Sequence, residues 1–501
     1  MKTEEHLPTS RREFMKGSAA LLAAAALSPA ARAVIITRTV APPRTIHPYP
    51  NQVAWGDGAW SFQRRVKLAV GADTEPGVVA LMQETWRQFT LGGVDLDVTR
   101  ERTLRTGQFA LADAHPPDLQ PRDTYALVAK ADGVAASAVD AAAMRHAWFT
   151  LLQLLQPGDE RRCTVPHVEI HDWPSLKFRG LHLCIFHETT PLMIEKALRL
   201  AAFYKFTHVV LEFWGMLRLD ALKELAWPEA WTKAEAGKLV GIARGLGLEV
   251  IPMFNSWGHA AACRIKYGRH VVLDQNPQLA PLFEPDGWTW CLSNPRVQTL
   301  LRSVCDELLE FAGPGQFFHI GCDEAYSHAT CDRCRQTDRV KLFVDHVNGL
   351  ADHLEQRGRR AIIWGDALLG EVSHKVVIAD WQYDITKGDV PTLAHFRERG
   401  YETLACPWNS LANIQTLARA AAANHSGLLM TTWHHLAQSI PTLAWTATCA
   451  WTESQTALGM KQCDWSRMRA TTASHLRNLV PAGGRYERAG WNPFEQPLEP
   501  D

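Results

Sequence analysis

The sequence has little net charge and no segment of simple composition. Its 501 residues carry a formal net charge of -1 at pH 7, which gives no reason to expect binding to nucleic acid or to an acidic membrane surface. We find no low-complexity tract and no short repeat, so solenoid folds have no support. A Gly-rich phosphate-binding turn is also missing, which weakens the case for a doubly wound sheet that binds a nucleotide.

Tyrosine is scarce, whereas tryptophan is abundant. The chain has 8 Tyr and 19 Trp, and large flat side chains suit stacking on sugar rings as well as ordinary packing. Hydrophobic residues make up 46% and charged residues 21%, which is typical of globular proteins. The length predicts two or three domains, or one large barrel with an accessory domain.

The N-terminus has the pattern of an export signal. Arg11 and Arg12 are flanked by Ser, Phe and Lys, and an apolar stretch follows over about 17–27. Ala-Arg-Ala at 31–33 then offers a cleavage site. The apolar stretch is too short for a helix that stays in the bilayer. We therefore expect residues 1–33 to be a bacterial twin-arginine signal peptide. The expected partner is the twin-arginine export machinery, the expected location is periplasmic or secreted, and no stable membrane anchor is expected.

Eleven cysteines leave at least one thiol unpaired if every disulfide is intramolecular. Cys331 and Cys334 form a Cys-x-x-Cys pair, which could bind zinc with His319 and Cys322, or form a disulfide in an oxidising compartment. A second pair at matching spacing is missing, so the sequence prediction is that the chain has no metal site and no cofactor. Four other cysteines lie in apolar runs and are expected in the core: Cys184, Cys305, Cys406 and Cys449.

Residues 34–170 are predicted to form a lead-in and a small α+β domain. Two strand-like runs, at 125–128 and 134–139, flank an Asp-Gly turn at 132–133. Apolar residues at helical spacing then predict an amphipathic helix over 140–155.

From about Trp173 onward, strand-like and helical patterns alternate. Apolar runs of strand length lie at 179–186, 206–213, 249–254, 316–321, 360–364, 375–381, 402–406 and 427–433. Strand-helix units of this number over 171–480 predict a (β/α)₈ TIM barrel, followed by a tail over 481–501. Chemistry in such a barrel sits at the carboxyl ends of the strands. Acids and aromatic residues gather at these strand ends, namely Glu212, Asp323, Glu324, Trp364, Trp381, Trp408 and Trp433.

The adjacent acids Asp323 and Glu324 are the main catalytic candidates. Cleavage of a glycosidic bond usually needs two carboxyl groups, but neighbours within a regular strand point to opposite faces. At a strand end after Gly321 the chain can leave the sheet, so that both acids reach one pocket. The alternative for an isolated Asp-Glu pair is the N-terminus of a helix, where acids stabilise the dipole.

The string Phe-His-Ile-Gly-Cys-Asp-Glu at 318–324 resembles the catalytic motif of family 20 glycoside hydrolases, the β-N-acetylhexosaminidases. Those carry His-x-Gly-Gly-Asp-Glu at the end of the fourth barrel strand. Further segments resemble the family in the right order, and the small domain resembles its accessory domain. These segments are His-Asp-Trp-Pro at 171–174, Phe-Arg-Gly at 178–180, Val-Ile-Pro at 250–252, Gly-His at 258–259, Leu-Ser-Asn-Pro at 292–295 and the run 440–452.

The resemblance implies an exo-acting, retaining enzyme that releases terminal N-acetylhexosamines from glycans. Glu324 would be the general acid and then the general base. Asp323 would orient the 2-acetamido group of the substrate, whose oxygen attacks the anomeric carbon. The remaining site residues would bind or orient the sugar: Arg179 and Glu212 at hydroxyls, His259 and His319 at the carboxylates or sugar, and Trp364, Trp381, Trp408 and Trp433 as pocket walls.

Several positions depart from the best-known family members. Cys322 replaces the usual second Gly, and with Tyr326 it resembles the hexosaminidase D-like branch more closely. The seventh strand ends without a clear acetamide-binding Tyr, for which Tyr383 is the candidate substitute. Trp433 is preferred to Trp451 as the sugar-site residue of the eighth strand. Two alternatives stay open: an exo-glycosidase of altered specificity, and a non-catalytic glycan-binding barrel.

Overall fold

The computed structural model describes residues 46–90, 93–122, 124–157, 162–260, 273, 276–365, 370–433, 436–452 and 465–480. The expected signal peptide and the expected C-terminal tail lie outside these ranges. Within the described ranges, the helices are all too short or too polar to cross a lipid bilayer.

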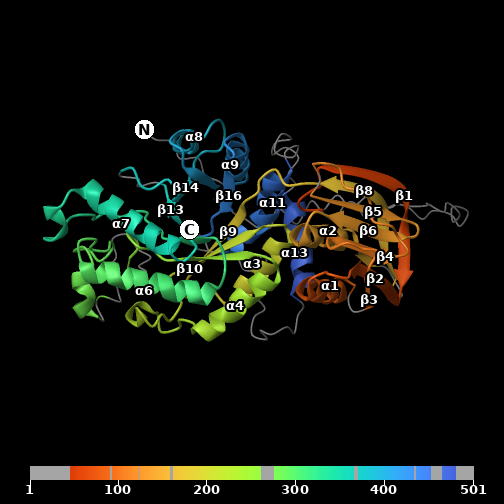
Figure 1. Ribbon diagram of the computed structural model, residues 1–501, viewed down its shortest axis with the longest axis horizontal. Helices are drawn as coiled ribbons and strands as arrows, with labels where there is room; N and C mark the ends of the chain where they lie inside the picture. Colours follow the sequence, from red (N-terminus) through yellow and green to blue (C-terminus); the bar gives the residue numbers. More distant parts are fainter. Residues whose placement is uncertain are drawn as a thin grey trace, which may run out of the picture. The chain divides into compact units, whose positions relative to one another are not determined.

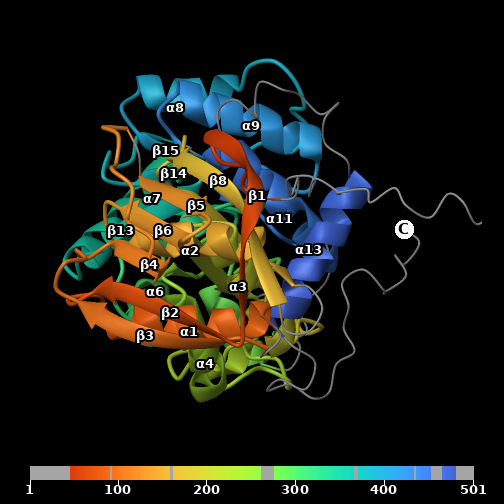
Figure 2. The same ribbon diagram turned by 90° about the vertical axis from the view of Figure 1, so that its right-hand side faces the viewer.

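The N-terminal part is a mixed sheet with helices on one face. Its strands run in the order β1-β8-β5-β6-β4-β2-β3, and most of this order can be followed in Figure 2. The short strand β7 pairs with β8, and the helices α1 and α2 cover one face of the sheet (Figure 1). The elements are β1 (Gln52–Gln63), β2 (Arg65–Gly71), α1 (Pro76–Phe89), β3 (Asp95–Glu101), β4 (Gln108–Ala112), β5 (Tyr125–Lys130), β6 (Gly133–Ala138), α2 (Ala141–Leu154), β7 (Gln156–Pro157) and β8 (Arg162–Asp172).

The hairpin and helix expected in this domain are confirmed. Strands β5 and β6 pair antiparallel, and the side chain of Asp140 caps α2 by accepting a hydrogen bond from the Ala143 N–H. Trp148 of α2 packs edge-on against Phe109 of β4, and Trp86 of α1 packs against Trp148. The aromatic rings therefore join both helices to the sheet.

The rest of the described chain forms the expected TIM barrel. Eight parallel strands close in the order β9-β10-β11-β12-β13-β14-β15-β16 and back to β9. They are β9 (Arg179–Ile185), β10 (His208–Phe213), β11 (Glu249–Met253), β12 (Phe317–His319), β13 (Arg360–Trp364), β14 (Val377–Trp381), β15 (Glu402–Cys406) and β16 (Gly427–Met430).

Helices pack around the outside of the barrel (Figure 1). The α-helices are α3 (Pro191–Phe203), α4 (Lys233–Gly245), α6 (Pro295–Ala312), α7 (Arg339–Glu355), α8 (Pro391–Glu398), α9 (Leu411–Ala423), α10 (Leu436–Ser439), α11 (Leu443–Trp451) and α13 (Trp465–Leu479). Short 3₁₀ turns are η3 (Lys223–Leu225), η4 (Pro277–Leu282), η5 (Cys334–Gln336) and η6 (Ile440–Thr442).

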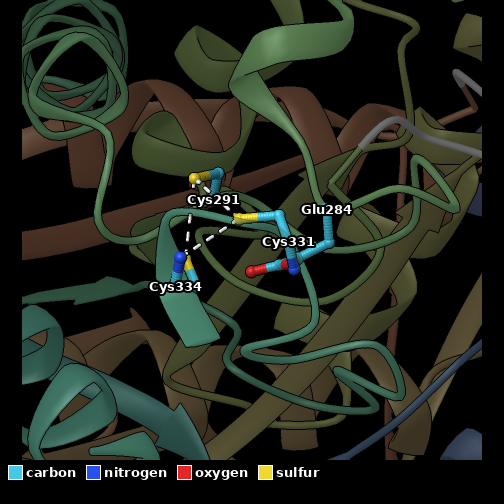
Figure 3. A group of neighbouring side chains, drawn as sticks. All are labelled: Glu284, Cys291, Cys331 and Cys334. Atoms are coloured by element: carbon cyan, nitrogen blue, oxygen red, sulfur yellow. Dashed lines mark hydrogen bonds between the residues drawn. The ribbon is translucent and has the colours of Figure 1, made fainter. Parts of the chain in front are cut away.

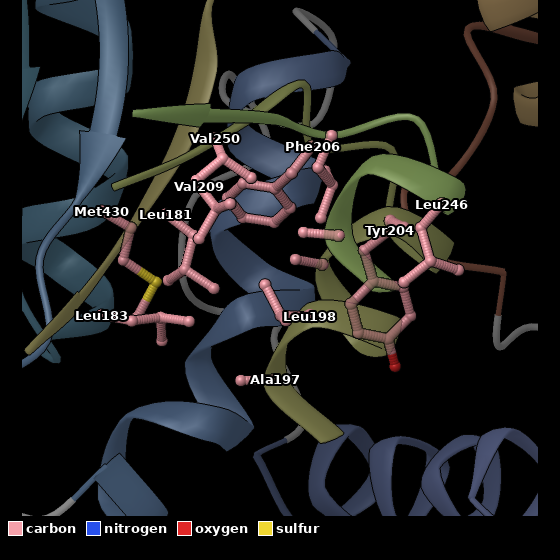
Figure 4. Close-up of a cluster of buried hydrophobic side chains, with 14 of the residues drawn as sticks. Leu181, Leu183, Ala197, Leu198, Tyr204, Phe206, Val209, Leu246, Val250 and Met430 are labelled. Atoms are coloured by element: carbon pink, nitrogen blue, oxygen red, sulfur yellow. The ribbon is translucent and has the colours of Figure 1, made fainter. Parts of the chain in front are cut away.

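Strand alternation decides which side chains enter the barrel. Leu181 and Leu183 of β9 and Val209 of β10 pack outward, in the buried cluster that includes Leu198 of α3 (Figure 4). The intervening residues point inward, so Val210 belongs to the separate cluster inside the barrel. The same alternation aims His182 and Glu212 into the barrel, close to the carboxyl ends of their strands.

A buried ionic network joins the sheet to the opposite, amino-terminal end of the barrel. Asp172, the last residue of β8, accepts hydrogen bonds from Lys205 Nζ at 3.1 Å and from the indole Nε1 of Trp451 at 2.8 Å. The Tyr125 hydroxyl also donates to Asp172. Lys205 and Asp172 are both fully buried, so each charge depends on the other. Trp451 is thus a structural residue, as its sequence context predicts.

Candidate active site

The chain leaves β12 through a run of unusual backbone conformations. Gly321, Cys322 and Glu324 have φ angles of 69°, 75° and 48°. Positive φ costs non-glycine residues about 1–3 kcal/mol each, so the surrounding structure must hold this path. The consequence is that Asp323 and Glu324 do not point to opposite faces, but approach one common partner.

That partner is the imidazole of His259. Its Nε2 atom lies 3.3 Å from Asp323 Oδ2 and 3.2 Å from Glu324 Oε2. The Asp323 side chain is 8% exposed and the Glu324 side chain 34%, so Glu324 is the acid that an incoming ligand can reach. Burial alone would lower the pKa of His259, but the charge of Asp323, the hydrogen bonds of Asp323 and Glu324 and the charge of Glu212 raise it to about 10. His259 is therefore a cation in contact with both acids.

Gly258 allows this approach. A Cβ atom placed on Gly258 would lie 2.0 Å from the backbone oxygen of Asp323 and 2.9 Å from the carbon of Glu324. Backbone atoms cannot move aside cheaply, so only glycine fits where the segment after β11 crosses the end of β12.

A second polar layer lies below the carboxylates. Glu212, at the end of β10, accepts hydrogen bonds from His182 Nε2 at 2.8 Å and from Asn255 Nδ2 at 2.6 Å. Burial opposes its ionisation, but these hydrogen bonds and the positive charge of His259 lower the pKa of Glu212. Both oxygens thus have protein partners. Glu212 also lines a largely apolar cavity that reaches His259, Asn255 and Trp214.

His319 and Trp364 occupy the barrel interior beside this layer. The His319 Nδ1 atom accepts a hydrogen bond from the Gly321 N–H at 3.0 Å, and its ring lies 4.4 Å from the Trp364 ring. Burial lowers the pKa of His319 well below its usual value, so the imidazole is neutral. Its Nε2 atom is buried and has no hydrogen-bond partner among the described residues, so the ring does not orient either carboxylate directly.

Aromatic residues from the last strands form one wall. The ring of Tyr383 lies 5.2 Å from Trp381 and 5.6 Å from Trp408, and its hydroxyl accepts a hydrogen bond from Trp433 Nε1 at 2.9 Å. Trp433 is in turn 5.8 Å from Trp364. Burial raises the pKa of Tyr383 well above its usual value, and the charge of Asp323 contributes to the increase. The charge of Asp323 therefore acts on the Tyr383 hydroxyl, which makes Tyr383 part of the same site.

Arg179 does not belong to this site, and the expectation that it binds sugar is wrong. It is the first residue of β9, at the end of the barrel away from the carboxylates. Its guanidinium donates to the carbonyls of Lys205 and Leu176 and lies 4.8 Å from the Trp451 ring centre. These contacts bury the side chain at the amino-terminal end of the barrel, next to Trp451.

Sequence reasoning did not single out two tryptophans that touch His259. Trp214 meets the imidazole edge-on at 5.0 Å, and Trp288 packs against it at 4.5 Å. Trp214 directly follows β10, so its strand-end position was a usable signal. Trp288 lies in the irregular segment between η4 and α6, where no periodic pattern marks it.

Two groups of described residues present metal-ligand atoms within 4.8 Å of one another. One is His182, Cys184 and Glu212, inside the barrel. The other is Glu284, Cys291, Cys331 and Cys334, in the segments that follow β11 and β12. His319 and Cys322, considered as zinc ligands with the Cys-x-x-Cys pair, are members of neither group.

Comparison with known families matches nearly the whole chain. The model described as "Glycosyl hydrolase family 20, catalytic domain" matches residues 188–481, more than half of the chain, and "Glycosyl hydrolase family 20, domain 2" matches 44–173. A "TAT (twin-arginine translocation) pathway signal sequence" matches 8–28, as the twin-arginine pattern predicts.

Characterised relatives are distant. A beta-hexosaminidase of Vibrio furnissii is 24% identical over 69% of this chain and 61% of its own length. A beta-hexosaminidase of Porphyromonas gingivalis is 23% identical over 67% of this chain and 47% of its own length. Hexosaminidase D of Bos taurus is 25% identical over 32% of this chain and 46% of its own. The chain thus spans only about half to three fifths of the length of these relatives.

Solved structures share the fold. The GH20 exo beta-N-acetylglucosaminidase from Vibrio harveyi superposes with a TM-score of 0.69 at 17% identity, over 87% of this chain and 77% of that one. The N-acetyl-beta-hexosaminidase of Streptomyces plicatus gives 0.66 at 18% identity, over 88% and 96%. At this level of identity the likeness establishes the architecture.

Proposed function

The chain belongs to glycosyl hydrolase family 20, and we propose that it is an exo-acting, retaining β-N-acetylhexosaminidase that releases terminal GlcNAc or GalNAc from glycans. The observation that carries this proposal is the meeting of Asp323 and Glu324 on His259 at the end of β12. Acids that approach one imidazole are too close together to flank a sugar with an attacking water between them. They suit a reaction in which the substrate supplies its own nucleophile.

Glu324 is the proton donor in this proposal. Its side chain is the more exposed of the two acids, so it can reach the glycosidic oxygen of a bound sugar. In the first step the bond from the anomeric carbon to that oxygen breaks, and Glu324 gives the oxygen its proton. The leaving group departs as an alcohol, and Glu324 becomes a carboxylate.

Asp323 and Tyr383 act on the acetamido group. The acetamide oxygen forms the new bond to the anomeric carbon, which gives a cyclic oxazolinium intermediate. Asp323 accepts a hydrogen bond from the acetamide N–H and balances the positive charge that develops there, while the Tyr383 hydroxyl donates to the acetamide oxygen. The hydrogen bond from Trp433 Nε1 to the Tyr383 hydroxyl, and the packing of Tyr383 against Trp381 and Trp408, fix its position before the substrate binds.

Water completes the reaction. Glu324 removes a proton from a water molecule, whose oxygen attacks the anomeric carbon and breaks its bond to the acetamide oxygen. Two inversions at one carbon retain the configuration, and Glu324 is again protonated. Barrel residues complete the pocket. Trp364 and Trp433 pack under the sugar, and His319 fixes the turn at Gly321. The negative charge of Glu212 stabilises the cationic form of His259.

The signal sequence directs export across the cytoplasmic membrane. We place the mature enzyme in the periplasm or outside the cell.

A substrate panel tests the proposal. Aryl N-acetyl-β-glucosaminide and aryl N-acetyl-β-galactosaminide both carry the 2-acetamido group and differ in configuration at C4. The plain aryl β-glucoside has the same leaving group but a hydroxyl in place of the acetamide. We expect hydrolysis of one or both acetamido sugars and none of the glucoside. Equal cleavage of the glucoside would refute the substrate-assisted route, and binding of the acetamido sugars without hydrolysis would favour a glycan-binding barrel.

A further inference from the structure

Three cysteines meet in the segments that lead from the barrel into α6 and α7. The Sγ atom of Cys291 lies 3.6 Å from that of Cys331 and 3.5 Å from that of Cys334 (Figure 3). Cys331 and Cys334 are the Cys-x-x-Cys pair, and Cys291 comes from the segment before α6, 40 residues earlier. Figure 3 shows the three sulfur atoms turned toward one another, with Glu284 beside them.

Glu284 adds a buried carboxylate to this group. The residue is 1% exposed, and its Oε2 atom accepts hydrogen bonds from the backbone N–H groups of Thr330 and Cys331 at 3.1 and 2.6 Å. Its Oε1 atom is buried and has no hydrogen-bond donor among the described residues. An unsatisfied buried carboxylate oxygen is costly, and a cation would satisfy it. One ligand atom from each of the four residues lies within 4.8 Å of the others.

A backbone amide holds one of the sulfur atoms in place. The N–H of Cys334 donates to Cys331 Sγ at 3.3 Å. N–H donors of this kind fix the orientation of metal ligands.

We propose that Cys291, Cys331, Cys334 and Glu284 bind one structural Zn²⁺ ion. Zinc prefers four tetrahedral ligands, and Zn–S bonds of about 2.3 Å require sulfur atoms about 3.8 Å apart, close to the separations seen here. Soft thiolates with one carboxylate favour zinc over magnesium or calcium. Four protein ligands leave no open position, so the ion supports the fold and takes no part in hydrolysis.

A disulfide accounts for the group less well. Only two of the three cysteines could pair, which would leave the third thiol and Glu284 Oε1 without a partner. The pair would also have to approach to about 2.05 Å. A protein folded in the reducing cytoplasm before twin-arginine export would meet zinc before it meets an oxidant.

The ion would join two loops that border the carboxylates. Glu284 and Cys291 bracket the segment that carries Trp288, and Cys331 and Cys334 lie shortly after Glu324. The zinc proposal goes beyond the proposed function, because it does not depend on which sugar the chain binds or cleaves.

Metal analysis of the purified full chain tests the site. We expect about one zinc per chain in the wild type by inductively coupled plasma mass spectrometry, and a loss of at least about tenfold in Cys291→Ser and Cys334→Ser. Cys163→Ser is the matched control, because Cys163 is also a buried free thiol but lies in β8. It should keep the wild-type zinc content.

The wild type alone gives a second readout if the serine variants fail to fold. Titration with an organic mercurial should release zinc in proportion to the thiols blocked, as followed with a metallochromic dye, and should lower the thermal midpoint. Wild-type protein without zinc, a mass loss of two hydrogens that marks a disulfide, or zinc retained in both serine variants would overturn the proposal.

Discussion

The indole Nε1 of Trp288 donates a hydrogen bond of 2.6 Å to the backbone carbonyl of Glu324. Trp288 also packs on His259, so one side chain fixes both the proposed proton donor and the cation beside it. Trp288→Phe keeps a ring and removes the donor. We expect kcat/KM to fall about tenfold, in line with a lost hydrogen bond of about 1.4 kcal/mol. Trp445→Phe is the control, since the Trp445 indole donates to the Leu411 carbonyl away from the site; an equal loss of activity in both variants would contradict the account.

Gly258→Ala should separate packing at the site from general stability. The added methyl group would collide with the backbone of Asp323 and displace both acids. A shift of about 1 Å at reacting groups costs about 10²-fold in rate, so we expect kcat to fall by at least that factor. Gly237→Ala on α4 meets no atom within 4 Å and should leave kcat unchanged while stabilising the helix by about 0.5–1 kcal/mol. Normal kcat in Gly258→Ala would show that the close approach is not required.

Because of His259, the free energy of unfolding should decrease as the pH rises into the alkaline range. Its folded pKa of about 10 is above the value of about 6.5 expected in the unfolded chain. The stabilisation is therefore fully present below about pH 6.5 and is lost as the pH rises through about 10. Urea unfolding of the wild type and His259→Asn across this window should give a steeper decline for the wild type. Parallel curves would mean that His259 is not held as a cation.

Removing one charge from the buried network of Asp172 and Lys205 should destabilise the fold. Asp172→Asn leaves Lys205 buried without its carboxylate, and burial already lowers the pKa of Lys205 to about 8 despite that partner. We expect the free energy of unfolding to fall by about 3–5 kcal/mol in chemical denaturation. Lys341→Met breaks an exposed ion pair with Asp345 and should cause no measurable change. Similar unfolding midpoints for the two variants would refute this role.

Local sequence patterns were sufficient to predict the barrel and the shared pocket of Asp323 and Glu324. Eight apolar runs predicted the eight strands, because the strands of a parallel barrel are largely buried on both faces. The break after Gly321 predicted that Asp323 and Glu324 share a pocket, and the left-handed conformations there explain how.

Features that arise only when distant loops meet were not predictable. Cys331 and Cys334 are visible as a pair, but Cys291 and Glu284 join them only because consecutive barrel strands bring their loops side by side. Arg179 was misplaced for a related reason: its position at the start of a strand sets it at the end of the barrel opposite the site. Trp288 has no local signal, since its role depends on the turn after β12.

Turnover of Asp323→Asn and Glu324→Gln on an aryl N-acetyl-β-hexosaminide tests the central claim most directly. The account predicts that each substitution lowers kcat by about 10²–10⁴-fold, while the thermal midpoint stays close to that of the wild type. Wild-type turnover in either variant would contradict the assignment of these two acids as the catalytic pair.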